Sequence, residues 1–217
     1  MSTAVPVWTE ATVLAPYAVI KAESYRTLTN LDLRAKHEGV LKLLVAAGGT
    51  TALTASSALV ARIMRTHSND ATSPAGGAVH FTGSHTRLGK ALINNGSNYA
   101  AGVVSIAYDG AGGTAFAQDD ILCLTGVTTI PTASGAISTP TMEWRKLSKG
   151  AATPITFVNP TDYAHNDNEF IVAGSAWDIY LPGGATYALE IDHLQDIASE
   201  AMFVAAYIET LDSYTIS

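Results

Sequence analysis

Threonine is abundant in this chain and helix-favouring residues are scarce, and this imbalance restricts the fold more than any other feature. Glu and Gln together number ten among 217 residues, whereas Thr alone occurs 25 times, often beside Val, Ile or Tyr. Glu and Gln favour helices, while Thr, Val, Ile and Tyr favour strands. We therefore expect strands, and the sequence lacks the regularly alternating helices that a parallel α/β sheet requires.

Short apolar segments recur along the chain between turn-forming residues. In the clearest one, Ala201–Thr210, both alternating faces are largely apolar, so we expect this strand in the middle of a sheet or at a subunit contact. A Pro-Gly-Gly turn at 182–184 precedes another strand. The remaining strands are expected at 40–47, 59–66, 78–82, 101–108, 121–127, 141–147, 155–158, 170–173, 176–181 and 186–191.

Many short strands separated by Gly, Pro and Asn turns predict an all-β fold, an antiparallel β-sandwich of the jelly-roll type. At most one or two short helices are expected, one of them at 193–199. Residues 1–16, which contain Pro6 and Pro16, are expected to form an extended N-terminal arm. Residues 17–217 are then expected to form a single sandwich domain.

Charged residues make up 14% of the chain, against about 25% in an average soluble domain. Such a surface suits a membrane protein or a subunit whose uncharged faces are covered by neighbours. The longest uncharged stretches, Leu43–Ala61 and Ile121–Met142, are interrupted by Gly, Ser, Thr or Pro, so we do not expect membrane spans. The first residues do not resemble a signal peptide, which predicts synthesis in a cytoplasm. Cys123 has no cysteine partner in this chain and is expected in the core.

The charges are unevenly distributed along the chain. All twelve Lys and Arg residues precede position 150, and the last 68 residues carry ten Asp and Glu. A net charge of −7 disfavours nucleic-acid binding, because phosphate neutralisation needs clustered Lys and Arg. Arg62, Arg65, Arg87 and Lys90 are the candidates for a small basic patch that contacts an acidic protein partner.

No pattern in the sequence indicates catalysis, a metal or a cofactor. Ser84 and His85 are sequence neighbours, which does not by itself make a catalytic pair. The loop 162–169 is rich in oxygen ligands, which leaves a calcium or magnesium site open, but it lacks the EF-hand spacing. We expect this loop to be a solvated acidic segment, and we expect the chain not to be an enzyme.

Three tryptophans raise the alternative of a carbohydrate-binding β-sandwich, in which aromatic side chains stack against sugars. Trp144 and Trp177 fall within expected strands and are expected in the core. Trp8, with Val5 and Val7 beside it on the expected arm, is instead predicted to anchor in a pocket on a neighbouring subunit.

The segment Leu28–Ala47 has the pattern of a strand, a polar turn containing Gly39 and a second apolar strand. In a chain rich in Thr, Ala and Gly without a signal peptide, this pattern resembles the β-sandwich accessory proteins of tailed-bacteriophage virions, most of all capsid decoration (cement) proteins. The resemblance implies a homo-oligomer, often a trimer, on the outer capsid surface. It implies that each subunit binds the major capsid protein through an extended arm.

Overall fold

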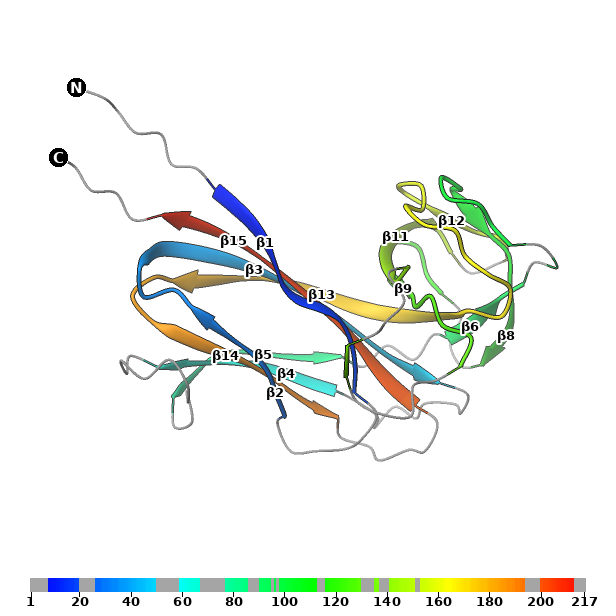
Figure 1. Ribbon diagram of the computed structural model, residues 1–217. Coiled ribbons are helices and arrows are strands. Elements are labelled where there is room, and N and C mark those ends of the chain that lie inside the picture. The colour runs from blue at the N-terminus through cyan, green and yellow to red at the C-terminus, as the bar shows by residue number, and fades with distance from the viewer. Residues whose placement is uncertain are drawn as a thin grey trace, which may run out of the picture.

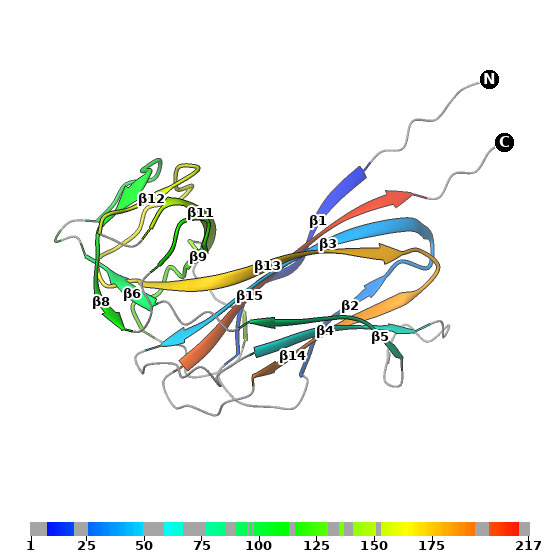
Figure 2. The ribbon, with the colours of Figure 1, turned by 180° about the vertical axis from the view of Figure 1, so that it is seen from behind.

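The computed structural model describes residues 8–19, 26–49, 59–66, 77–85, 90–94, 96, 98–112, 116–129, 135–136, 141–150, 153–193 and 200–212. Every regular element in these ranges is a β-strand and every strand pairing is antiparallel, as Figures 1 and 2 show from opposite sides. The expectation of an all-β sandwich is confirmed.

Eight long strands form the part of the molecule that we call the body. They are β1 (Trp8–Val19), β2 (Arg26–Asp32), β3 (Lys36–Gly49), β4 (Leu59–Thr66), β5 (Ala78–His85), β13 (Phe170–Pro182), β14 (Thr186–His193) and β15 (Glu200–Asp212). One sheet of the body has the order β1-β15-β3-β13 and the other the order β2-β14-β4-β5. The pairs β1–β15, β2–β14, β3–β13 and β4–β5 are nested inside one another, which is the connectivity of a jelly roll.

The remaining strands lie between β5 and β13 in the sequence, and we call residues 90–169 the insert. Its strands are β6 (Lys90–Ile93), β7 (Ser105–Ile106), β8 (Tyr108–Gly112), β9 (Ile121–Leu124), β10 (Gly135–Ala136), β11 (Glu143–Lys149) and β12 (Ile155–Phe157). Most of them form a second lobe at one end of the body, whereas β10 pairs with β1 at the edge of the large sheet.

Strand β13 belongs to both lobes and joins them. Its residues Phe170–Val172 pair with β6, and Ile171–Gly174 pair with β9, while Gly174–Pro182 pair with β3 of the body. A Cβ atom on Gly174 would lie 2.6 Å from the Trp144 ring and 2.8 Å from the Val45 carbonyl oxygen, so only glycine fits where the pairing changes. The yellow-to-orange ribbon of β13 therefore runs unbroken from the insert into the body (Figure 1).

The core of the body follows from strand alternation. Leu41, Leu43 and Val45 on β3 face inward and are fully buried against Tyr187 and Leu189 from the opposite sheet. The Tyr187 hydroxyl donates a hydrogen bond to the Pro182 carbonyl at 2.6 Å, which satisfies the one polar group of this aromatic residue. The expected turn at 182–184 is confirmed, with Gly184 at a φ of 75°.

The chain departs from the sequence expectations at its first strand and in having a second lobe. Residues 8–16 were expected in an arm, and this is wrong, because they form most of β1, whose backbone pairs with β15 from Trp8 to Val19. The sandwich expected over 17–217 contains an additional lobe, the insert. The helix expected at 193–199 lies outside the described residues except for His193, which ends β14. Strand β15 lies between β1 and β3, so the expected central position is confirmed.

Candidate functional site

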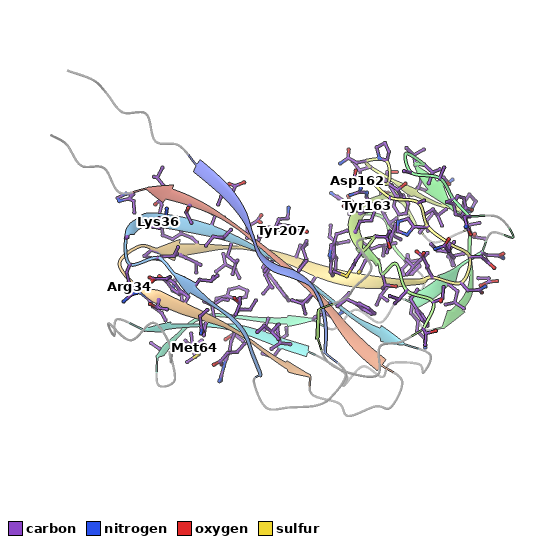
Figure 3. The ribbon with its side chains drawn as sticks, viewed as in Figure 1. Arg34, Lys36, Met64, Asp162, Tyr163 and Tyr207 are labelled. Carbon is purple, nitrogen blue, oxygen red and sulfur yellow. The ribbon has the colours of Figure 1, made fainter. Side chains whose placement is uncertain are left out.

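A cleft of about 750 Å³ lies between the insert and the outer face of the large sheet of the body. Figure 3 shows Tyr207 on the body and Asp162 and Tyr163 on the insert, the side chains that line its two sides. Clefts of about 300–1,000 Å³ are typical of small-molecule sites. We therefore treat this cleft as the candidate functional site.

The floor of the cleft is made by outward-facing residues of β13, β3 and β15. Lys42 lies in register with Asp178 on one side and with Tyr207 on the other, so these three residues form one row across the sheet. Val40 and Glu209 form part of the next row, since they are paired in the same way. Directly opposed side chains in a sheet are about 5 Å apart at Cβ, which brings a cation, two carboxylates and an aromatic ring close together.

The opposite wall comes from β11 and from the loop 159–163 of the insert. Trp144 lies at the base, where it packs on the hydrophobic cluster that includes Leu44 and Phe203 of the body. Lys146 lies on the same face of β11, and Tyr163 and Asn159 lie on the loop. Alternation places Trp144 on the cleft side of β11 and its neighbour Glu143 on the interior side of the insert.

Behind this wall, the fully buried side chain of His165 lies between two carboxylates. Its Nε2 is 2.6 Å from Glu143 Oε1 and its Nδ1 is 2.7 Å from Glu169 Oε2. Both ring nitrogens can donate only in the imidazolium form, so the geometry fits a protonated His165 between two anions. The backbone N–H and side-chain amide of Asn166 also donate to Glu169 Oε1, at 2.9 and 2.8 Å.

The pKa values of this cluster reflect a competition between burial and pairing. Burial alone would lower the pKa of His165, but the hydrogen bonds to Glu143 and Glu169 outweigh it and raise that pKa to about 9. Burial would raise the pKa of Glu169, but the hydrogen bonds from His165 and Asn166 prevail and lower it. His165 and Glu169 are therefore both charged near neutral pH.

Arg145 connects this buried cluster to the cleft. Its guanidinium pairs with Glu143 and also with Asp162, the latter at 2.7 Å, and the Asp162 backbone N–H donates to Glu143 at 2.8 Å. Lys146 pairs with Asp119 at 2.8 Å. The contacts of Glu143 and Arg145 attach β11 to the loop 159–169, and the Lys146–Asp119 pair attaches β11 to the residues before β9, so the cleft wall is held at both sides. The expectation of a solvated loop at 162–169 is wrong for Glu169, because this residue is buried and paired with His165.

The structure does not assemble the expected basic patch from its described members. Arg62 pairs with Glu190 on the neighbouring strand at 2.5 Å, and Arg65 lies over the Tyr187 ring at 5.9 Å. Lys90 is a buried residue of β6, in the other sheet. Val5, Val7 and Arg87 lie outside the described residues, and Trp8 is described only as the first backbone position of β1.

The structure also shows where the residues considered for catalysis and metal binding lie. Ser84 is exposed, whereas His85 next to it is buried and its Nδ1 lies 2.8 Å from Ser175 Oγ, so Ser84 and His85 point to opposite faces of β5. Within the described ranges, no group of three or more His, Cys, Asp or Glu side chains is arranged to hold a metal ion. Cys123 is fully buried, as expected, and burial followed by the Glu143 charge raises the pKa of its thiol.

Sequence reasoning did not find the cleft. Its residues come from β3, β9, β11, β13, β15 and one loop, and no spacing along the chain links them. Trp144 was expected in the core, yet it is partly exposed at the base of the cleft. Trp177 does pack against the core, edge-on to Phe81. An aromatic residue next to two basic ones, as in Trp144-Arg145-Lys146, was the available signal.

Comparison with known proteins adds no assignment, since no family model, curated protein or solved structure matches the chain. Searching the described residues for a helix long and apolar enough to cross a membrane also found none.

Proposed function

We propose that the chain is a non-enzymatic virion structural protein, a capsid decoration subunit that binds the major capsid protein lattice on the outer surface of the particle. The observation that carries this proposal is the nested eight-strand connectivity of the body. Jelly rolls of this kind recur in viral capsid proteins and in lectins. The link from fold to function is an analogy, and it agrees with the resemblance of Leu28–Ala47 to decoration proteins.

The surface of the molecule supports a role in assembly. Charged residues form only 14% of the chain, and several large apolar side chains are exposed. Val79 is 56% exposed on β5, at an edge of the smaller sheet, and Val104 and Val158 are about half exposed on the insert. Edge strands and exposed apolar residues suit a subunit that is covered by neighbours, including further copies of itself in a trimer.

The distribution of charge bears on how the subunit would attach. Two of the basic residues pair with late acidic residues inside the molecule, as Arg145–Asp162 and Arg62–Glu190. The sequence asymmetry is thus partly neutralised within the fold. Attachment would depend on exposed apolar and neutral surface more than on a basic patch, and it should therefore resist moderate salt.

Sedimentation of native particles tests this proposal. The chain should co-sediment with assembled capsids at a fixed ratio to the major capsid protein, and purified chain added to stripped capsids should restore ordered density on the lattice in cryo-electron microscopy. Sedimentation with tails alone, or no occupancy on stripped capsids, would contradict a decoration role. Val79→Asp and the pair Val104→Asp with Val158→Asp, each expected to fold, would show which lobe faces the shell.

A further inference from the structure

We propose that the cleft between the insert and the body binds a neutral oligosaccharide. This inference goes beyond capsid attachment and does not rest on it, because the cleft is defined by contacts within one chain. The lining combines aromatic side chains with carboxylate, ammonium and amide groups, and a sugar presents both an apolar ring face and several hydroxyl groups.

The aromatic component comes from both sides of the cleft. Trp144 lies at the base, Tyr207 lies on the floor and Tyr163, which is 41% exposed, lies on the insert side. The faces of aromatic rings carry negative charge density and attract weakly positive C–H edges. A pyranose ring has such C–H groups on its apolar face, so it can pack against rings placed on two sides of one cleft.

The polar component is concentrated in the rows of the floor. Asp178 and Glu209 are exposed carboxylates that accept hydrogen bonds, and Lys42 beside Asp178 donates them. A carboxylate has two oxygens and can accept hydrogen bonds from two neighbouring hydroxyl groups at once, in the same fork geometry that it uses with arginine. A row of acceptor, donor and aromatic ring therefore fits the alternation of hydroxyl groups and C–H face on a sugar.

Two other ligand classes fit less well. A polyanion such as a nucleic acid or a sulfated glycan needs several available cations. Of the three basic residues that line the cleft, Arg145 is bound to Glu143 and Asp162, Lys146 is bound to Asp119, and Lys42 lies beside the Asp178 carboxylate. A polyanion would also meet Asp178 and Glu209 on the floor. A fully apolar ligand would have to remove the charged floor from water without replacing its hydrogen bonds.

The wall is braced before any ligand arrives. His165, Glu143 and Glu169 hold the loop to β11 through buried charged hydrogen bonds. A site whose wall is already ordered loses less conformational entropy on binding. Binding should therefore proceed with small backbone changes.

Saturation-transfer NMR on the full chain tests the proposal, with maltotriose, cellotriose, lactose and chitotriose as probes at millimolar concentration. At least one probe should receive magnetisation from the protein, and its affinity should fall about tenfold or more in Tyr163→Ala and in the double variant Asp178→Asn with Glu209→Gln. These side chains are exposed, so both variants should keep the parent melting temperature.

Tyr180→Ala is the matched control. Tyr180 is 54% exposed on the same outer face of β13 but is not part of the cleft, so its loss should leave the affinity unchanged. The proposal is overturned if none of the four probes binds, if binding survives in both cleft variants, or if Tyr180→Ala weakens binding as much as Tyr163→Ala. Heparin competing in a salt-dependent way would also overturn it, in favour of an anion site. Capsid occupancy is measured separately, so either proposal can fail alone.

Discussion

The body and the insert are both antiparallel β structures, but they are stabilised in different ways. The body has two sheets of strands up to 14 residues long, which enclose an apolar core containing fully buried residues such as Leu41, Ile63 and Tyr187. The seven described strands of the insert are two to seven residues long. It has its own apolar cluster, around Leu122 and Leu147, and beside it the buried ionic cluster of His165.

This difference indicates which interactions fix the strand pairing in each lobe. Long strands with one apolar face define their partners by hydrophobic burial, which has no directional preference and tolerates small shifts. Short strands bury little area per strand, so the insert adds charged hydrogen bonds that demand a particular geometry. Removing buried apolar side chains should therefore destabilise the body most. Removing charged hydrogen-bond partners should destabilise the insert most.

The largest effect should follow from His165→Ala. This substitution leaves the Glu143 and Glu169 carboxylates buried without their shared cation, and removing one member of a buried ion pair costs about 3–5 kcal/mol. Hydrogen exchange should show loss of protection in β11, β12 and the loop 159–169, with β4 and β14 less affected. His37→Ala, at an exposed histidine of the body, should leave exchange unchanged. Equal loss of protection in the body and the insert would contradict the claim that His165 stabilises the insert selectively.

A cavity in the body should be nearly as costly but should act on the whole molecule. Leu43 is fully buried in the main core, and Leu→Ala changes at such sites cost about 2–5 kcal/mol. Because β3 pairs with β13, and β13 continues into the insert, Leu43→Ala should lower the stability of both lobes, as measured by near-UV circular dichroism and hydrogen exchange. Insert unfolding that is unaffected by Leu43→Ala would show that the lobes are thermodynamically independent.

Raising the pH should weaken the insert selectively. The pKa of His165 is raised to about 9 in the folded state, from an ordinary value of 6.5, so its stabilising contribution is complete below about pH 6.5 and is lost as the pH rises through 9. The lowered pKa of Glu169 acts in the opposite direction, since its contribution is present above its ordinary pKa of 4.5 and is lost as the pH falls below it. Denaturant unfolding followed by hydrogen exchange should show the insert weakening by at most about 3 kcal/mol between pH 6.5 and 9. The same dependence in His165→Ala would assign it to another group.

The smallest effect should come from the ion pairs nearer the surface. Arg62→Met removes the pair with Glu190 on the body, and Lys146→Met removes the pair with Asp119 on the insert. Pairs of this kind contribute about 0–1 kcal/mol, and the more exposed Lys146 pair should contribute less. Chemical denaturation of the two variants at low and high salt measures both. A larger cost for Lys146→Met would show that charge pairing stabilises the insert even at its surface.

Much of the strand content could be predicted from local patterns. The segment 59–66 is β4 with the expected bounds, and the expected strand 201–210 lies within β15. Errors arose where a local signal met a stronger tertiary one. Pro16 suggested irregular structure, but β1 accommodates it through shifts in its register with β15 between Leu14 and Tyr17. The strand expected at 101–108 is divided, since within it only Ser105–Ile106 (β7) and Tyr108, the first residue of β8, are strand residues.

The sequence by itself determined the class of fold, because side-chain alternation and turn residues act over a few positions and are visible in one chain. It also determined the core position of Cys123, whereas for β15 it left two positions open, the middle of a sheet or a subunit contact. Only the tertiary structure decided which charged side chains pair with one another. Arg145 meets Asp162, and Glu143 meets His165, across 17 and 22 positions of chain, because neighbouring segments of the insert pack together. A charge is expensive to bury alone, so its partner is fixed by packing geometry, and sequence order carries no record of that geometry.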